Sequence, residues 1–524
     1  MDAERERAPA IWELANVEPE SVAIEDHRGL ITFAELEAKT NALAHGLEGL
    51  GLAPGDHVAL MASNRAEFLI ALIAGMRSGM VVTPLKTSWT AEEVAYVLAD
   101  ACTRAVVTDI DAARQAAQAA SVALVDLDRG VAGRSLDAWL GAQPSAPLPR
   151  DRRGWRMSYT SGTTGRPKGV RRLNDGQRPW CEAFAASRGH TRVLQLPTDG
   201  THLVVSALFH GAPLAFALSL LASGCRLRIM RRWDAEAALD ELARDVRSTC
   251  MVPTMFRQLL ALPAARRRAF SAPELHCVLH GGEPCPQPLK REMIDWLGPI
   301  LVEYYGMTEG GMSVATSAEW LARPGTVGRP ALGMEVQILG PSGERLPPGE
   351  HGTIYFRTPS GRSFEYRNSP EKTAAAYSPE GAFTVGDIGF VDADGYLFIS
   401  GRTSDVIVSG GVNLYPAEIE DLLYGLTEVR EACVVGGPDE LRGESPVAFV
   451  VLDRAAIGDE PDAEARALAA IEAACAGRLA GYQRPRRFVV RPELPRDPTG
   501  KLLRHLMRAE LWAGRDSNFA APAR

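Results

Sequence analysis

The chain has 524 residues, of which 57 are Lys or Arg and 65 are Asp or Glu, so its formal net charge is −8. This length exceeds one ordinary domain, and the acidic balance argues against a nucleic-acid binder. The composition, 46% apolar and 23% charged, excludes a disordered chain. Its eight cysteines form no CxxC pair, which argues against a metal cluster or disulfide scaffold and favours the reducing cytoplasm.

Strands and helices alternate through the first part of the chain, which predicts an α/β domain with a parallel sheet. Apolar residues at helical spacing mark the helices, and a capping-box pattern begins one of them at Thr90. The expected elements are helices at 31–50, 64–76 and from 90, and strands at 57–61, 81–85, 106–108 and 122–126. A Pro-rich connector at 141–153 ends this part.

The second half begins with another α/β run over 193–304 and then changes character. Short apolar alternations split by Gly and Pro predict antiparallel strands, in a small barrel, over 323–358. Segments 396–400 and 405–409 are expected to pair with each other. Gly410-Gly411 is expected to form a turn, and Pro416 to begin a helix. The remainder has the pattern of a small α+β unit, with strands at 432–435, 447–452 and 487–490 and a helix at 463–479.

The membrane-related signals are weak. The most apolar stretch, 203–222, is interrupted by polar residues, Gly and Pro, so it is expected to form buried core elements and no membrane span. The charged N-terminus has no apolar region of the kind that a secretory signal needs. Two basic clusters, Arg266–Arg268 and Arg484–Arg487, fit solvated faces best, and a weak peripheral contact with a membrane stays open.

The strongest chemical signal is the run Tyr159-Thr-Ser-Gly-Thr-Thr-Gly-Arg-Pro-Lys168-Gly-Val170. Glycines let backbone N–H groups approach an anion, hydroxyls donate further hydrogen bonds, and Lys168 adds a positive charge. The run therefore predicts a phosphate-binding loop. It is no Walker A loop, because Arg166-Pro167 precedes Lys168 and Gly169 follows it.

This loop resembles the signature of the adenylate-forming superfamily, which includes acyl-CoA synthetases, luciferase and the adenylation domains of peptide synthetases. Further motifs follow in that family's order over nearly the whole chain. They are Ala207-Leu-Phe-His-Gly211, Val252-Pro-Thr-Met-Phe256, His280-Gly-Gly-Glu-Pro284, Tyr305-Gly-Met-Thr-Glu309, Gly386-Asp-Ile-Gly389, Gly401-Arg-Thr-Ser-Asp405, Gly410-Gly411, Pro416-Ala-Glu-Ile-Glu420 and Pro495…Gly500-Lys501.

The resemblance implies the fold and the domain organisation. A large N-terminal domain, 1–402, would contain two α/β sheet subdomains and a small β-barrel, and would bind ATP and the acid. A small mobile α+β domain, 403–524, would carry the catalytic Lys501. The two would rotate about a hinge at Gly401-Arg-Thr-Ser-Asp405, where Ser404 replaces the Asp or Lys of many relatives. The oligomeric state is left open between a monomer and a homodimer.

The resemblance also implies roles for single residues. Lys501 would be catalytic with Thr308, which would donate to the α-phosphate, and Glu309 would hold Mg²⁺. Asp387 would bind the ribose with help from Arg402, and Tyr305 would enclose the adenine against Gly281-Gly282. His210 would lie beside the acyl group, and Gly410 and Gly411 would reach the pantetheine of CoA. The remaining nucleotide-binding residues would be Thr160, Ser161, Gly162, Thr163, Thr164, Gly165, Lys168 and Glu283.

These residues imply an ATP-dependent carboxylic acid:CoA ligase that forms acyl-AMP and pyrophosphate, then acyl-CoA and AMP. Amino-acid-activating relatives carry an aspartate at the His210 position, so a plain acid is expected, with a medium- or long-chain fatty acid favoured over aryl or alicyclic acids. Ligation to a carrier protein stays an alternative, although no carrier domain follows Lys501. A non-catalytic nucleotide-binding protein and a luciferase-type oxygenase are the weaker alternatives.

Overall fold

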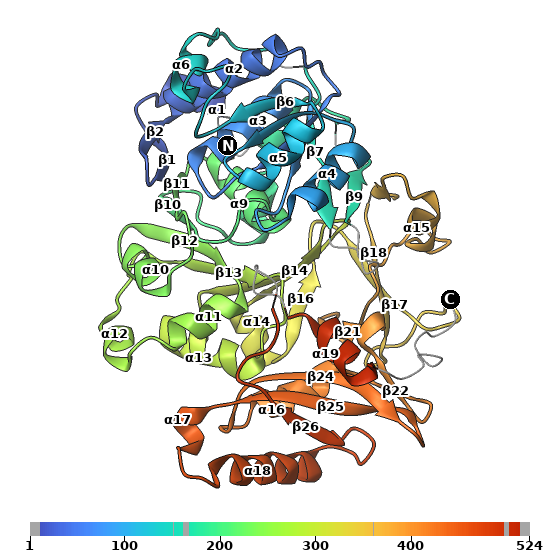
Figure 1. Ribbon diagram of the computed structural model, residues 1–524. Coiled ribbons are helices and arrows are strands. Elements are labelled where there is room, and N and C mark those ends of the chain that lie inside the picture. The colour runs from blue at the N-terminus through green and yellow to red at the C-terminus, as the bar shows by residue number, and fades with distance from the viewer. Residues whose placement is uncertain are drawn as a thin grey trace.

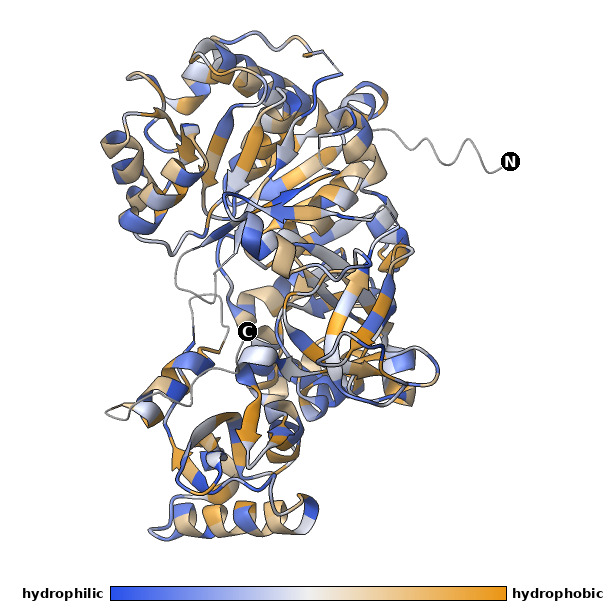
Figure 2. Cartoon of the chain, turned by 90° about the vertical axis from the view of Figure 1, so that its right-hand side faces the viewer, coloured by the Kyte–Doolittle hydropathy of each residue, from blue (hydrophilic) through white to orange (hydrophobic). Residues whose placement is uncertain are grey.

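The computed structural model describes residues 11–149, 151–160, 167–174, 176–359, 361–496 and 502–513. Figure 1 shows two α/β regions stacked on each other and a smaller unit, coloured orange to red, beneath them. Apolar residues follow the strands of all three parts (Figure 2).

The first region is a parallel sheet in the strand order β6-β5-β3-β4-β7. Successive residues of its strands face opposite sides, so Val58 packs against α2 and α3 while Ala59 packs against α4 and α5. Its strands are β3 (His57–Met61), β4 (Val81–Pro84), β5 (Thr103–Thr108), β6 (Ala123–Asp126) and β7 (Trp155–Arg156). Its helices are α2 (Phe33–Gly49), α3 (Ala66–Arg77), α4 (Ala91–Asp100), α5 (Asp111–Ala119) and α6 (Leu136–Gly141).

The predicted elements of this region are confirmed, with small changes at their ends. Thr90 forms the expected capping box with Glu93 at the start of α4. Helix α3 begins two residues later than predicted, because Arg65 has extended backbone and serves as its N-cap residue.

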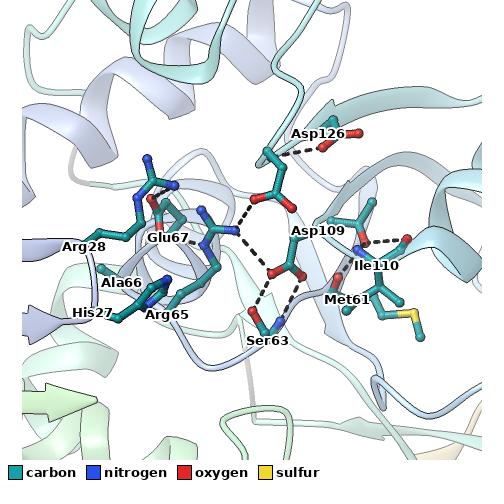
Figure 3. A network of polar contacts seen from close by, with 12 residues as sticks. His27, Arg28, Met61, Ser63, Arg65, Ala66, Glu67, Asp109, Ile110 and Asp126 are labelled. Atoms are coloured by element: carbon teal, nitrogen blue, oxygen red, sulfur yellow. Dashed lines mark hydrogen bonds and ion pairs between the residues drawn. The ribbon is translucent and has the colours of Figure 1, made fainter. Parts of the chain in front are cut away.

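Arg65 also organises a buried polar network that fastens the first region to the second (Figure 3). Its guanidinium pairs with Glu67 at 2.8 Å, with Asp128 at 2.8 Å and with Asp109 at 3.3 Å. Beside it, Asp26 of the second sheet accepts a hydrogen bond of 2.9 Å from the backbone N–H of Ala66. The network surrounds a buried guanidinium with carboxylates and holds the carboxyl end of β3 against the neighbouring sheet.

The second sheet has a parallel part in the order β14-β13-β12-β10-β11-β1, with β2 antiparallel at its edge. Its strands are β1 (Val22–Asp26), β2 (Gly29–Thr32), β10 (Thr201–Val204), β11 (Arg226–Ile229), β12 (Val246–Met251), β13 (Cys277–Gly281) and β14 (Leu301–Met307). Helices α9 (Gly211–Ala222), α10 (Ala235–Leu242), α11 (Pro253–Leu260) and α13 (Gln287–Leu297) connect them. The shorter helices outside the C-terminal unit are α1 (Ile11–Val17), α7 (Trp180–Ala186), α8 (Gly189–Val193), α12 (Ala264–Ala269), α14 (Ser317–Ala322) and α15 (Pro370–Ala375).

The apolar stretch 203–222 forms β10 and α9, whose side chains are largely buried, as the sequence predicts. Within the described ranges, every helix is too short or too polar to cross a lipid bilayer.

Antiparallel strands continue the same sheet beyond β14 and confirm the change of character predicted for 323–358. They are β15 (Gly310–Thr316), β16 (Thr326–Pro330), β17 (Glu335–Leu339), β18 (Gly352–Arg357), β20 (Asp387–Val391) and β21 (Leu397–Arg402). A separate ladder of β8 (Ser158–Thr160), β9 (Lys168–Arg172) and β19 (Phe364–Tyr366) packs on them. The two groups enclose their own core, in which Phe356, Phe364 and Phe383 are fully buried.

The C-terminal unit is a mixed sheet with helices on both faces. Helices α16 and α18 cover one face through Ile419 and Ile471, and α19 covers the other through Met507 (Figure 1). The strands are β22 (Ile407–Ser409), β23 (Val412–Leu414), β24 (Val429–Asp439), β25 (Gly443–Leu452) and β26 (Arg487–Val490). The helices are α16 (Pro416–Tyr424), α17 (Arg454–Ile457), α18 (Ala463–Arg478) and α19 (Arg504–Trp512).

The predicted pairing of 396–400 with 405–409 is wrong. Strand β21 pairs with β16 and β20, whereas β22 pairs with β23 and β25 of the C-terminal sheet. A single 3-10 turn, Thr403–Asp405, separates the two strands. Both segments have the apolar alternation of a strand, and the turn between them carries the chain from one sheet to the next.

Candidate active site

The carboxyl ends of β13 and β14 bring the predicted adenine-binding residues together. Gly281 lies opposite Tyr304 in the ladder, and Tyr305 is the next residue of β14. A Cβ at Gly281 would lie 2.2 Å from the Tyr304 carbonyl oxygen, so only glycine fits there. Gly282 has φ +82° and open space around its Cα. A ligand at this edge would meet backbone on one side and an aromatic ring on the other.

Asp387 joins the same edge from the antiparallel strands. It lies opposite Arg402 in the β20–β21 ladder and is 6% exposed. One carboxylate oxygen accepts a hydrogen bond of 2.5 Å from the Tyr305 hydroxyl, and the other accepts one of 3.0 Å from Arg402 Nε. Burial, and then the Asp387 charge, raise the pKa of Tyr305 well above its usual value, so the hydroxyl stays a donor. Three predicted residues thus form one hydrogen-bonded group.

The hairpin that begins with β14 also carries the two residues predicted for the phosphates and the metal. Thr308 and Glu309 form the turn between β14 and β15, a few residues beyond Tyr305. Glu309 is 7% exposed, and its Oε1 accepts a hydrogen bond of 2.8 Å from the Tyr366 hydroxyl. A buried carboxylate that, among the described residues, accepts a hydrogen bond on one oxygen fits a hard cation such as Mg²⁺, which prefers oxygen ligands.

The predicted phosphate-binding loop reaches this hairpin through Lys168. Thr160 and Lys168 lie opposite each other in the β8–β9 ladder, which brings the two ends of the loop together. Ser161, Gly162, Thr163, Thr164 and Gly165 lie outside the described residues. The Lys168 ammonium lies 5.4 Å from the centre of the Tyr366 ring, whose hydroxyl binds Glu309. Tyr366 therefore connects Lys168 to Glu309.

Glu283, for which the sequence predicts a nucleotide-binding role, contacts two other parts of the chain. Its Oε1 accepts a hydrogen bond of 2.6 Å from the Thr254 backbone N–H, in the first turn of α11. Its Oε2 lies 3.9 Å from Arg496 Nη1 of the C-terminal unit. Lys501 lies outside the described residues, but Arg496 and Leu502, which flank 497–501, form a β-bridge. The described residues on either side of Lys501 are thus anchored close to Gly282.

His210 lies at the N-cap position of α9, and the centre of its ring lies 4.5 Å from that of Phe209. Arg156 Nη1 donates a hydrogen bond of 3.3 Å to the next carbonyl, that of Gly211.

Gly410 and Gly411 form the exposed turn between β22 and β23, as predicted. Their φ angles are +59° and +84°, a region that favours glycine. A Cβ at Gly411 would meet no atom of the described residues within 4 Å, whereas one at Gly410 would lie 3.8 Å from Arg442 Cγ.

The basic cluster at Arg266–Arg268 is largely neutralised by its neighbours. Arg266 pairs with Glu236 at 2.9 Å and with Asp240 at 2.5 Å, and Arg267 pairs with Glu292 at 3.2 Å. In the second cluster, Arg484 donates to the carbonyls of Ala476 and Leu479. These contacts favour the solvated faces expected from the sequence over a membrane-binding patch.

Sequence reasoning missed Tyr366 and Arg156. Tyr366 enters the site because β19 pairs with β9, a contact between segments almost 200 residues apart. Arg156 enters because β7 lies beside the start of α9. Neither residue belongs to a local motif, and only the strand pairing of the folded chain reveals them.

Comparisons with known proteins agree with this geometry. The family model described as AMP-binding enzyme matches residues 11–362, and its C-terminal domain model matches residues 418–501. A fatty acid–acyl-carrier-protein ligase of Streptomyces coeruleorubidus is 32% identical over 95% of each chain. A feruloyl-CoA synthase of an Amycolatopsis species is 34% identical over 94% of this chain and 96% of its own. The ATP-bound structure of MatB from Rhodopseudomonas palustris superimposes with a TM-score of 0.81 at 27% identity, covering 98% of this chain and 100% of that one. The chain belongs to the family of AMP-binding enzymes.

Proposed function

We propose that the protein is an ATP-dependent carboxylic acid:CoA ligase that forms an acyl-AMP intermediate and releases pyrophosphate. One observation carries the proposal. The β14–β15 hairpin joins a nucleoside end, where Tyr305 binds Asp387, to a phosphate end, where Glu309 is connected to Lys168 through Tyr366. A single nucleotide could lie along this hairpin, with its sugar and its phosphates near groups of matching chemistry.

In the proposed reaction the acid carboxylate attacks the α-phosphorus of ATP, and the bond to the pyrophosphate oxygen breaks. Both reactants are anions, so the barrier is largely electrostatic. Asp387 would hold the ribose hydroxyls as their acceptor, and Thr308 would donate to the α-phosphate. Glu309 would hold Mg²⁺, which when bound would neutralise phosphate charge. Lys501 would supply the cation where the carboxylate and the α-phosphate meet.

The second half-reaction moves the acyl group from AMP to a thiol. We propose that the domain 403–524 rotates relative to 1–402, about the turn Thr403–Asp405, so that the Gly410-Gly411 turn replaces the Lys501 segment at the active site. Rotation would exclude water from the reactive anhydride while it admits the thiol. The exposure of this turn supports the proposal, because Gly410 and Gly411 can be brought to another surface without first being uncovered.

The acid is proposed to be apolar and uncharged apart from its carboxylate, with a medium- or long-chain fatty acid favoured. His210 supports this, because it offers no anion to a substrate ammonium group. The named substrates of the relatives include both a fatty acid and the aromatic ferulic acid, so an aryl acid is the second candidate. A carrier protein is the second candidate acceptor, because one relative is named for that acceptor. We also propose a cytoplasmic location.

The test is a panel of acids assayed for AMP release with CoA and with a phosphopantetheinyl carrier protein. We expect fatty acids and CoA to give the highest rates. In the same panel, 4-methylpentanoate should be activated much better than leucine, because the leucine ammonium would be buried without a partner. Equal pyrophosphate exchange with these two acids would contradict the assignment of His210.

Lys501→Ala tests the catalytic cation in the same assay. It should reduce acyl-AMP formation by several orders of magnitude and largely spare thioester formation from supplied acyl-AMP. Equal damage to both half-reactions would contradict the role.

A further inference from the structure

A cavity of about 270 Å³ lies on the side of β9 that faces α4, next to the phosphate end of the candidate active site. It is bounded by the end of α4, by the start of β9 and by the segment that leads from β19 into α15. Its lining consists of Tyr96, Asp100, Pro167, Lys168, Gly169, Arg367, Asn368, Ser369 and Lys372. The volume accommodates several waters or a small anion.

The cavity wall carries more positive than negative charge. Lys168, Arg367 and Lys372 line it, and within the part of the chain that the structure describes none of the three forms an ion pair. The Arg367 Nε atom donates instead to the backbone carbonyl of Asp100, at 2.7 Å. Neighbouring cations that no carboxylate neutralises produce a local field that attracts an anion.

The single carboxylate in the wall is already bound on both oxygens. Asp100 Oδ2 accepts a hydrogen bond of 2.5 Å from the Tyr159 hydroxyl, and Oδ1 accepts one of 3.0 Å from Asn368 Nδ2. These neutral donors hold the carboxylate in the wall, so it neutralises none of the three cations by direct contact.

Lys168 lines the cavity and also contacts Tyr366 in the candidate active site. Burial, and then the charge of Lys372, lower the pKa of Lys168, while the charge of Glu309 acts more weakly in the opposite direction. Two ammonium groups that repel each other this way would be stabilised by an anion between them.

We propose that this cavity binds the pyrophosphate group that leaves the α-phosphorus, with Arg367 and Lys372 as binding residues in addition to Lys168. The inference rests on the proposed function. When the acid oxygen bonds to the α-phosphorus, the bridging oxygen departs with the electron pair, and the charge that develops on the pyrophosphate is met by these cations. No further reactant is needed.

The direct test is calorimetric titration of the full-length protein with inorganic pyrophosphate at low ionic strength. Lys372→Met should raise the Kd of pyrophosphate about tenfold, the effect expected for losing one charge-assisted contact. Arg367→Met should raise it to a similar degree, and Arg367→Lys should restore part of the affinity. The matched control is Lys39→Met, which removes the same charge from α2, where Lys39 pairs with Asp137 at 3.8 Å.

Each outcome decides the proposal. The proposal is supported if Lys372→Met and Arg367→Met lose pyrophosphate affinity about tenfold, if Lys39→Met does not, and if the difference becomes smaller at high salt. Wild-type protein that binds no pyrophosphate overturns it, and so do equal Kd values in wild type, Lys372→Met and Arg367→Met. A parallel titration with adenosine 3′,5′-bisphosphate, which carries phosphates of the kind found in CoA, tests whether the cavity binds CoA instead. If Lys372→Met and Arg367→Met weaken the binding of this compound and leave pyrophosphate binding unchanged, the proposal is overturned.

The same titration separates failure of this site from failure of the ligase assignment. It contains neither acid nor ATP, so it reports on the cavity even when no acid in the panel supports pyrophosphate exchange. Lys372 is exposed, and a melting temperature within error of wild type would exclude unfolding as the cause of any loss.

Discussion

Tyr366 is the residue through which the two phosphate-facing groups of the site contact each other. Its hydroxyl binds Glu309 at 2.8 Å, and its ring lies under the Lys168 ammonium at 5.4 Å. The hydroxyl and the ring act on different partners, so a substitution that removes only one of them is informative.

Tyr366→Phe removes the hydroxyl and leaves the ring. Glu309 would then lose the donor that fixes its carboxylate, so the Mg²⁺ concentration for half-maximal activity should rise by about three- to tenfold. This is at the lower end of the loss of metal affinity that follows removal of a hydrogen-bond partner of a metal ligand. A magnesium titration of pyrophosphate exchange measures it. The control is Tyr377→Phe, whose hydroxyl binds, among the described residues, the backbone of Ser363 and Phe364. The control should melt at a lower temperature with an unchanged magnesium requirement, and the reverse pattern would contradict the role of Tyr366.

At the scale of the elements, local signals predict the strands and helices well and their partners less well. The capping box at Thr90 and the proline at the first position of α16 are properties of neighbouring residues, and both elements begin where predicted. The pairing of 396–400 with 405–409 fails because strand pairing depends on the whole sheet. Apolar alternation makes each segment a strand, but it carries no information about which sheet receives it.

The β22–β23 hairpin offers a test with an internal control. Gly411 has φ +84°, and Gly395, in the β20–β21 turn, has φ +82°; a Cβ at either position would meet no atom within 4 Å. Leucine at either position should therefore cost a similar strain, about 1–2 kcal/mol of unfolding free energy. Gly411→Leu should also lose CoA-dependent turnover while it keeps acyl-AMP formation, whereas Gly395→Leu should keep both.

Thermal melts and separate assays of the two half-reactions check this prediction. The substituted Gly411 would block the thiol only after the C-terminal domain has rotated, since the turn is exposed in the present arrangement. If both variants lose stability alike and both keep thioester formation, Gly411 serves the turn and not the thiol.

At the scale of the whole molecule, the site is assembled from segments that are distant in sequence. The motifs identify Lys168, Glu309 and Asp387 one by one, but their mutual contacts depend on β19 pairing with β9 and on Tyr305 reaching across to β20. Glu283 is a further example. Its place next to Gly282 predicts a nucleotide contact, and the fold adds contacts of its carboxylate with α11 and with Arg496, which no local motif reveals.

Polar and aromatic contacts between described residues join the N-terminal part to the C-terminal unit. Arg496 lies 3.9 Å from Glu283, Gln287 donates to Asp421 at 3.3 Å, and the rings of His351 and Tyr415 stack at 4.8 Å. Contacts of this kind are typical of an interface that opens. The Arg496 contact also holds the chain that flanks 497–501 near the nucleoside end of the site, so this arrangement fits the first half-reaction.

Glu283→Gln tests that assignment. The amide oxygen can still accept the hydrogen bond from the Thr254 N–H, so α11 should keep its cap, but the charge facing Arg496 is lost. Acyl-AMP formation should slow by about three- to tenfold, as expected for a partly buried ion pair worth about 1 kcal/mol, and thioester formation from supplied acyl-AMP should be unchanged. Glu431→Gln is the matched control, because it removes the partner that Arg496 has inside the C-terminal unit, at 2.7 Å.

The competing account, in which Glu283 binds the nucleotide, instead predicts a higher KM for ATP with little change in kcat. A lower kcat for acyl-AMP formation at an unchanged KM for ATP would support a role of Glu283 in the contact between the domains. A selective rise of the KM for ATP would instead show that Glu283 binds the nucleotide.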